Sequence, residues 1–287
     1  MEVSLLLQTI ANFLVLSSMY ILVGLGFAFL FNMLGILNLA HGAIYMVSGY
    51  LGYVLITGTG INQWIAVLIT ILLVSAFGMF LQEFCFRPFI GDFNRLVMVC
   101  VAISVILSTT VNLIAGTKST AIPSFAKGIL NIGSISISYE KIVTCAIGII
   151  LLLIVIWFVN RTKLGKQMQA IAQNREGAAL QGISIRRVSI FSCALGCAFA
   201  AIAGCLMGSY LSLAPFMGDN MLIKTLMLVM LAGAGSTGGI FIAGLIIGCL
   251  DTVLPIFVSG NAGSAIVVVL LIILLLFRPQ GFFGHEA

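Results

Sequence analysis

The chain has 287 residues, of which 61% are hydrophobic and only 7% are charged, and its mean hydropathy is +1.24. A soluble domain carries about 25% charged residues, so this chain has too few to cover a surface that faces water. The composition therefore excludes an ordinary soluble fold and predicts a polytopic all-α membrane protein in a lipid bilayer. The net charge of +5 is concentrated at the ends of the apolar runs, so it does not indicate a nucleic-acid partner.

Uncharged apolar runs of about 18 residues or more are typical of membrane-spanning helices, and this chain predicts about 8–10 of them. The best estimate is nine, over residues 5–31, 33–57, 62–85, 96–116, 140–160, 188–213, 221–234, 238–257 and 262–277. We interpret residues 1–287 as a single transmembrane domain. The stretches FNMLGILNLAHG and LAGAGSTGG predict broken or re-entrant helices, and their positions in the two halves indicate an inverted repeat.

The stretch NLAHG places two polar side chains, Asn38 and His41, inside an apolar segment. Polar groups in lipid are costly and usually face the interior of the bundle. On a helix, these two residues share a face. We interpret them as hydrogen-bonding structural groups near the transport pathway, in preference to direct substrate contacts. The candidate pathway residues are Asn38, His41, Gly42, Gly235 and Gly239. A proton relay would need a titratable partner for His41, and Asp251 is the candidate, unless it lies near the outer surface.

Glu83 and Arg87 are four residues apart in the favourable order for a helical ion pair, and Pro88 then ends the helix. We interpret this stretch as an elbow at the membrane edge.

The external loop 116–141 predicts short strands or interfacial structure at Ile132, Ile135 and Ile137. It is either a docking surface for an external partner or a plain connector. Two other groups of residues predict packing. The first is a small-residue face suited to close helix contact, formed by Gly196, Ala200, Gly204 and Gly208. The second is the seven cysteines, which all lie in apolar stretches and are read as small apolar residues, with no metal.

Basic residues in short loops favour the cytoplasm. Nine of them lie in the loop 86–95, the loop 160–187 and the C-terminal tail, against four on the other side, namely Lys118, Lys127, Lys141 and Lys224. The two loops and the C-terminus are therefore predicted to be cytoplasmic.

The loop 161–187 holds seven of the chain's 21 charged residues. Asn174 suits an N-cap, Glu176 complements the helix dipole in the first turn, and Gly182 is a natural C-terminal stop. They predict a short helix over about 175–181, outside the lipid, that presents an apolar side to a cytoplasmic protein. The stretch QMQAIA suggests a second short helix just before it. The candidate coupling residues are Asn174, Glu176, Ala178, Ala179, Leu180 and Gly182. The alternative is a solvated basic loop.

EGAALQG (Glu176–Gly182) resembles the E-A-A-x-x-x-G coupling motif of ABC importer permeases. Gly177 stands at the first alanine position, and the usual Leu-Pro does not follow. Nearly the whole chain resembles the LivH-like permeases of branched-chain amino-acid ABC importers. That resemblance rests on five motifs in order, which are NLAHG, EFCFRP, QAIAQNREGAALQGI, LAGAGSTGGIFIAGLIIG and RPQGFFG.

The resemblance implies a permease subunit of the bacterial inner membrane that forms the pathway for Leu, Ile, Val or related amino acids. It implies as partners a second permease, LivM-like or identical, two cytoplasmic ATPase subunits and an extracytoplasmic substrate-binding protein. The sequence contains no G-x-x-x-x-G-K-[ST] phosphate loop. We therefore expect no enzyme activity and no cofactor in this chain, with ATP hydrolysis on a partner.

Other functions stay open from the sequence. The chain is alternatively an ABC permease for urea, amides or another small solute, or a secondary transporter or channel that works alone. A membrane-embedded enzyme would need a reactive cluster of side chains. The predicted docking helix favours the ABC permease, but the sequence decides neither the substrate nor the choice between homodimer and heterodimer.

Overall fold

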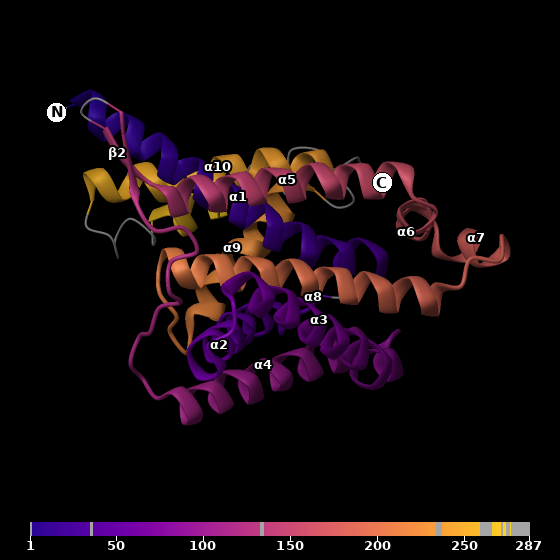
Figure 1. Ribbon diagram of the computed structural model, residues 1–287. Coiled ribbons are helices and arrows are strands. Elements are labelled where there is room, and N and C mark those ends of the chain that lie inside the picture. The colour runs from indigo at the N-terminus through magenta and orange to yellow at the C-terminus, as the bar shows by residue number, and fades with distance from the viewer. Residues whose placement is uncertain are drawn as a thin grey trace. The chain divides into compact units, whose positions relative to one another are not determined.

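A computed structural model describes residues 2–34, 37–132, 135–233, 237–258, 266–270, 272–273 and 276. The described part is mainly helical (Figure 1). The helices are α1 (Glu2–Leu34), α2 (His41–Thr59), α3 (Gln63–Phe80), α4 (Phe93–Ala115), α5 (Tyr139–Arg161), α6 (Lys163–Gln173), α7 (Arg175–Leu180), α8 (Ile185–Tyr210), α9 (Met217–Ala232) and α10 (Thr237–Phe257). A π-helical turn, η1 (Leu81–Phe86), and a 3-10 turn, η2 (Arg87–Phe89), follow α3, and the strands are β1 (Ile129–Ile132) and β2 (Ile135–Ser138).

Six of the described helices are long and apolar enough to cross a membrane. They confirm the predicted class of a polytopic all-α membrane protein. These spans are Leu6–Phe31, Gln63–Phe89, Phe93–Ala115, Tyr139–Arg161, Ile185–Tyr210 and Gly238–Phe257. Two further helices match predicted spans but are not among these six, α2 with 19 residues and α9 with 16. The ninth predicted span, 262–277, lies partly outside the described residues, and the inverted repeat stays a prediction.

The chain divides into two compact units. Unit 1 comprises residues 1–24, 124–152 and 223–287, and unit 2 comprises residues 25–123 and 153–222. The single domain expected from the sequence stays a prediction.

In unit 2, helix α8 packs along α2 and α3, and α4 packs on α2 (Figure 1). The predicted small-residue face of α8 is confirmed, because Gly196, Ala200, Gly204 and Gly208 are all buried. Gly196 meets the backbone of Gly26 on α1, where an added methyl group would lie 2.6 Å from the Gly26 carbonyl oxygen. Only glycine permits such an approach, so these helices pack backbone to backbone.

The cysteines are only partly packing residues. Cys100, Cys193, Cys197 and Cys205 are buried, and an added methyl group on Gly78 of α3 would lie 2.5 Å from the Cys197 sulfur. The packing interpretation is wrong for Cys249, which is exposed on α10. Apolar sequence context does not distinguish a side chain that faces lipid from one that faces another helix.

In unit 1, α10 and α5 pack against the first part of α1. An added methyl group on Gly148 of α5 would lie 2.7 Å from Ser18, and Gly244 and Gly248 of α10 lie against Ile21 and Ser17. The strands expected in loop 116–141 are also confirmed. They form an antiparallel hairpin that pairs Ile129 with Ser138 and Ile132 with Ile135.

We predict that Gly196→Ala destabilises the fold by about 1–3 kcal/mol, since a methyl group at this contact overpacks two backbones that cannot move independently. Its thermal unfolding midpoint in detergent should fall below that of the wild type. Gly58→Ala is the matched control, because an added methyl group there has only one neighbour, at 4.0 Å. Equal midpoints for the two variants would contradict the close helix contact.

Candidate functional site

Helix α7 has the start and the stop that the sequence predicts. The Asn174 side chain is its N-cap and accepts a hydrogen bond from the Gly177 N–H at 2.8 Å. After α7, Gly182 has a φ of +80°, a left-handed conformation that favours glycine. The Gly182 N–H donates to the Ala179 carbonyl at 3.0 Å, which helps to close the helix end. The predicted helix at about 175–181 is therefore confirmed as Arg175–Leu180.

The second predicted short helix is confirmed as α6. The Thr162 side chain is its N-cap and accepts a hydrogen bond from the Gly165 N–H at 3.0 Å. One side of α6 is buried through Gly165, Met168 and Ile171, whereas Lys163 and Lys166 are exposed. Residues three apart lie on one helix face, so α6 is amphipathic and its buried face holds it against the protein.

The exposed part of α7 is smaller than expected. Ala178 is only 5% exposed, so the expectation that it faces a partner is wrong. The short helix places Ala178 on its inner side, and no periodic pattern in six residues reveals that side in advance. Leu180 is 90% exposed and Ala179 is also exposed, as is Glu176 in the first turn. Leu180 is therefore an unshielded apolar side chain on a capped helix.

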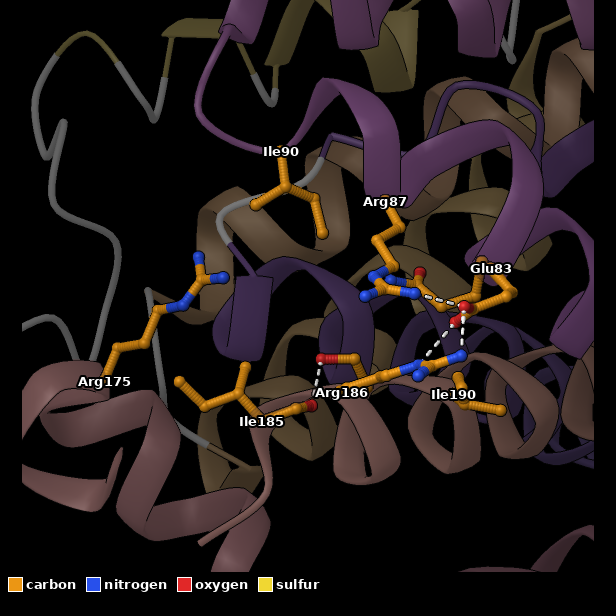
Figure 2. Close-up of a pocket in the computed structure, with 9 residues that line it drawn as sticks. Glu83, Arg87, Ile90, Arg175, Ile185, Arg186 and Ile190 are labelled. Atoms are coloured by element: carbon orange, nitrogen blue, oxygen red, sulfur yellow. Dashed lines mark hydrogen bonds and ion pairs between the residues drawn. The ribbon is translucent and has the colours of Figure 1, made fainter. Parts of the chain in front are cut away.

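A glutamate flanked by arginines lies beside this loop (Figure 2). Glu83, in the π-helical turn after α3, pairs with Arg87 as predicted. It also pairs with Arg186 in the first turn of α8, which the sequence did not predict. The Arg186 side chain donates from its Nε to one Glu83 oxygen at 3.2 Å and from a terminal nitrogen to the other at 2.5 Å. This bidentate pair ties the end of α3 to the start of α8, directly after the loop. The turn η2 holds Pro88 and ends the helix as predicted, and the place of this elbow at the membrane edge stays a prediction.

The candidates Asn38, His41 and Gly42 lie together in unit 2. Asn38 and His41 are both 0% exposed, but α2 begins at His41, so the premise that the two share a helix face is wrong. Asn38 lies in the preceding turn, where its side-chain oxygen accepts from the Ala40 N–H at 3.1 Å.

Helix packing surrounds the other two residues of this group. The His41 ring lies edge-on to Phe27 at 5.8 Å, and Gly42 contacts the backbone of Gly218. These contacts are those of packed structural groups. A role of any of the three in the pathway stays a prediction.

Of the other two pathway candidates, Gly239 lies in the first turn of α10. Gly239 is buried against the backbone of Ala232 at the end of α9. Gly235 and the motif RPQGFFG lie outside the described residues.

Sequence reasoning missed a polar cluster in unit 1. Lys224 of α9 pairs with Asp251 of α10, whose side chain is only 6% exposed. The Tyr20 hydroxyl of α1 also donates to Asp251, and Lys224 lies 3.0 Å from that hydroxyl. Lys224 lies within α9, as the predicted span 221–234 has it, and its place on the outer side stays a prediction. The alternative that Asp251 lies near the outer surface stays a prediction. Two opposite charges in consecutive apolar helices were the available signal, because intramembrane charges usually pair.

These features define the class as a multi-pass α-helical membrane protein with a structured, charged loop outside its apolar helices. The sequence pattern of the family described as "Branched-chain amino acid transport system / permease component" matches residues 9–276. The chain therefore belongs to this family of transport permeases.

Similar proteins carry names that agree with this family assignment. The high-affinity branched-chain amino acid transport system permease proteins LivH of Salmonella typhimurium and BraD of Pseudomonas aeruginosa are each 29% identical over 294 residues. Each match covers 97% of this chain and 95% of the relative. A chain of the solved structure of PsaBC from Streptococcus pneumoniae in complex with Fab has a TM-score of 0.52 at 14% identity. The match covers 94% of this chain and 91% of that chain. At this identity the likeness shows the fold alone.

We predict that Lys224→Met and Asp251→Leu each destabilise the protein by about 3–5 kcal/mol, because each leaves a buried charge without its partner. The double variant should recover most of this loss, since neither charge is then left alone. Thermal unfolding midpoints of the purified variants measure both effects, with the exposed Lys127→Met as the control. Additive losses in the double variant would mean that the pair is not coupled.

Proposed function

We propose that this chain is the membrane-spanning permease subunit of an ABC importer for branched-chain amino acids in the bacterial plasma membrane. The main support for this proposal is that a chain of this family carries a short, capped helix, α7, with an exposed apolar side chain. Its N-cap at Asn174 and stop at Gly182 fix the helix, and its Leu180 is 90% exposed. An exposed apolar anchor on a rigid helix suits a protein contact.

The candidate coupling residues divide into two roles. Ala179 and Leu180 form the exposed surface on which an ATPase subunit docks, with Glu176 in the exposed first turn. Asn174 and Gly182 fix the two ends of the helix, and Ala178 holds it against the protein from inside. Small side chains allow close approach, so this surface suits a groove on the partner.

The orientation follows from chain connectivity and charge. Hairpin β1–β2 directly precedes α5, and α6 directly follows it, so the hairpin and the loop lie on opposite faces if α5 spans the membrane. The loop 160–187 has six basic residues and is the cytoplasmic one under the positive-inside rule. The hairpin then lies outside, on the side from which a substrate-binding protein delivers its substrate. The C-terminus is proposed to be cytoplasmic on the same grounds.

The working assembly contains two permease subunits, with either a LivM-like partner or a second identical chain. It also contains two cytoplasmic ATPase subunits, which hydrolyse ATP. The names of the relatives support a branched-chain amino acid as substrate, and urea, amides or another small solute are the alternative. A secondary transporter that works alone is less well supported. In the described part of unit 1, Lys224 and Asp251 neutralise each other instead of offering an unpaired charge to a coupling ion.

We predict that Leu180→Glu and Ala179→Glu abolish the association with the ATPase subunits and ATP-driven leucine uptake. The introduced glutamate would be buried at the centre of the interface without a partner, and this costs about 2–5 kcal/mol of binding free energy. Membrane abundance should be normal, because both positions are exposed. Co-purification from mild detergent and uptake into proteoliposomes measure the two effects.

Ala172→Glu provides the matched control, since it makes the same alanine-to-glutamate change at an exposed position of α6 in the same loop. Its ATPase association and uptake should equal those of the wild type. If Leu180→Glu and Ala179→Glu also retain both properties, α7 is not the docking helix.

We predict that a cysteine at Gln173 is protected from an impermeant thiol reagent on intact cells, whereas one at Lys127 is labelled. Both positions are exposed, and each would be introduced into a cysteine-free background. Labelling after permeabilisation is the control for reactivity. The reverse pattern would place the α6–α7 loop outside the cell and rule out docking of a cytoplasmic ATPase there.

A further inference from the structure

The pocket beside α7 carries more positive than negative charge. It has a volume of about 190 Å³, and three arginines and one glutamate line it. Glu83 is already paired with two of these arginines, Arg87 and Arg186. The third, Arg175, is exposed, and it forms no ion pair or hydrogen bond with any of the described residues. The pocket therefore has an excess of guanidinium donors over acceptors.

The three arginines come from three different elements and converge on this space. Figure 2 shows Arg175 reaching from α7 on one side, with Arg87 and Arg186 gathered around Glu83 on the other. Ile90 and Ile185 lie between the two sides and line the pocket with apolar surface. A guanidinium presents five N–H donors in a planar fork, so Arg87 and Arg186 can hold Glu83 and still donate to a second acceptor. The chemistry of the pocket suits a carboxylate or a phosphate.

Size favours a side chain over a whole small molecule. Pockets for small-molecule ligands have volumes of about 300–1,000 Å³, and this pocket is smaller. A single carboxylate side chain fits a space of this size, and its methylene groups would contact Ile90 and Ile185.

We propose that the pocket receives an aspartate or glutamate side chain from the ATPase subunit that docks on α7. This inference rests on the proposed function, because it adds a charged anchor to the same contact. Arg175 is the first residue of α7, and Leu180 is its last, so a protein that covers Leu180 is close enough to reach the pocket. The incoming carboxylate accepts hydrogen bonds from Arg175 and from the free donors of Arg87.

Such an anchor has a mechanical consequence. Arg87 lies in the elbow after α3, and Arg186 lies in the first turn of α8. A partner carboxylate held there would contact α7 and the elbow directly. It would be linked to the start of α8 indirectly, because Glu83 pairs with both Arg87 and Arg186. Movement of the ATPase subunit would then act directly on two membrane helices as well as on the loop.

The test compares Arg175→Gln with Arg187→Gln, a matched control at an exposed arginine that does not line the pocket. The affinity of the purified ATPase subunit for the permease complex is measured in nanodiscs of phosphatidylcholine alone and in nanodiscs that also contain phosphatidylglycerol. We expect Arg175→Gln to weaken binding roughly tenfold in both lipids, as expected for loss of one charged contact. Arg187→Gln should change the affinity by less than about twofold.

A charge reversal identifies the partner group. Arg175→Glu should abolish binding, and one aspartate-to-arginine or glutamate-to-arginine substitution on the ATPase subunit should restore it. An effect of Arg175→Gln only in phosphatidylglycerol would overturn the proposal in favour of a lipid headgroup. Equal affinities for Arg175→Gln and Arg187→Gln, or no restoring substitution, would also overturn it.

Leu180→Glu separates this proposal from the proposed function. If Leu180→Glu abolishes ATPase binding and Arg175→Gln does not, α7 is the docking helix and only the acidic anchor is wrong. If both variants bind normally, docking on α7 itself is wrong.

Discussion

Backbone contact between helices is the constraint on which the rest of this structure depends. Lipid supplies no hydrophobic force to press helices together, so association relies on close packing of small residues. Gly26 and Gly196 meet in this way in unit 2, and Gly42 meets Gly218. These contacts leave no space for side chains between the backbones, so they fix the positions of the helices that carry His41 and Arg186. In unit 1, Gly148, Gly244 and Gly248 have the same role against α1.

The apolar surroundings of the helices also determine how the charged side chains are arranged. Inside the apolar helices, Lys224 and Asp251 neutralise each other across two helices, because an isolated charge there is costly. At the end of α3 the arginine side chains are exposed and the arrangement differs, since one glutamate pairs with two arginines and a third has no described partner. In the Lys224–Asp251 cluster each charge has its partner, which suits a structural role. The second cluster has one arginine without a described partner, and it lies next to α7, the proposed docking helix.

Local signals in the loop were sufficient to predict its structure. Asn174 and Gly182 act on the backbone within three residues of themselves, so the start and stop of α7 follow from the sequence. The burial of Ala178 did not follow, because it depends on what lies beneath a six-residue helix. The pairing of Glu83 with Arg186 also did not follow. The two residues are 103 positions apart, and only the packing of α3 against α8 brings them together.

By itself, the sequence determined the membrane class, the approximate helix positions, the short helices of the loop and the small-residue face of α8. All of these depend on composition, periodicity or chemistry within a few residues of the chain. Only the tertiary structure decided that Asn38 precedes α2 and does not share its face, that Cys249 is exposed, and that Lys224 pairs with Asp251. The physical reason is that an apolar side chain or a charge has several acceptable environments in a membrane protein. The choice among them is made by the neighbouring helix, which can come from a distant part of the chain.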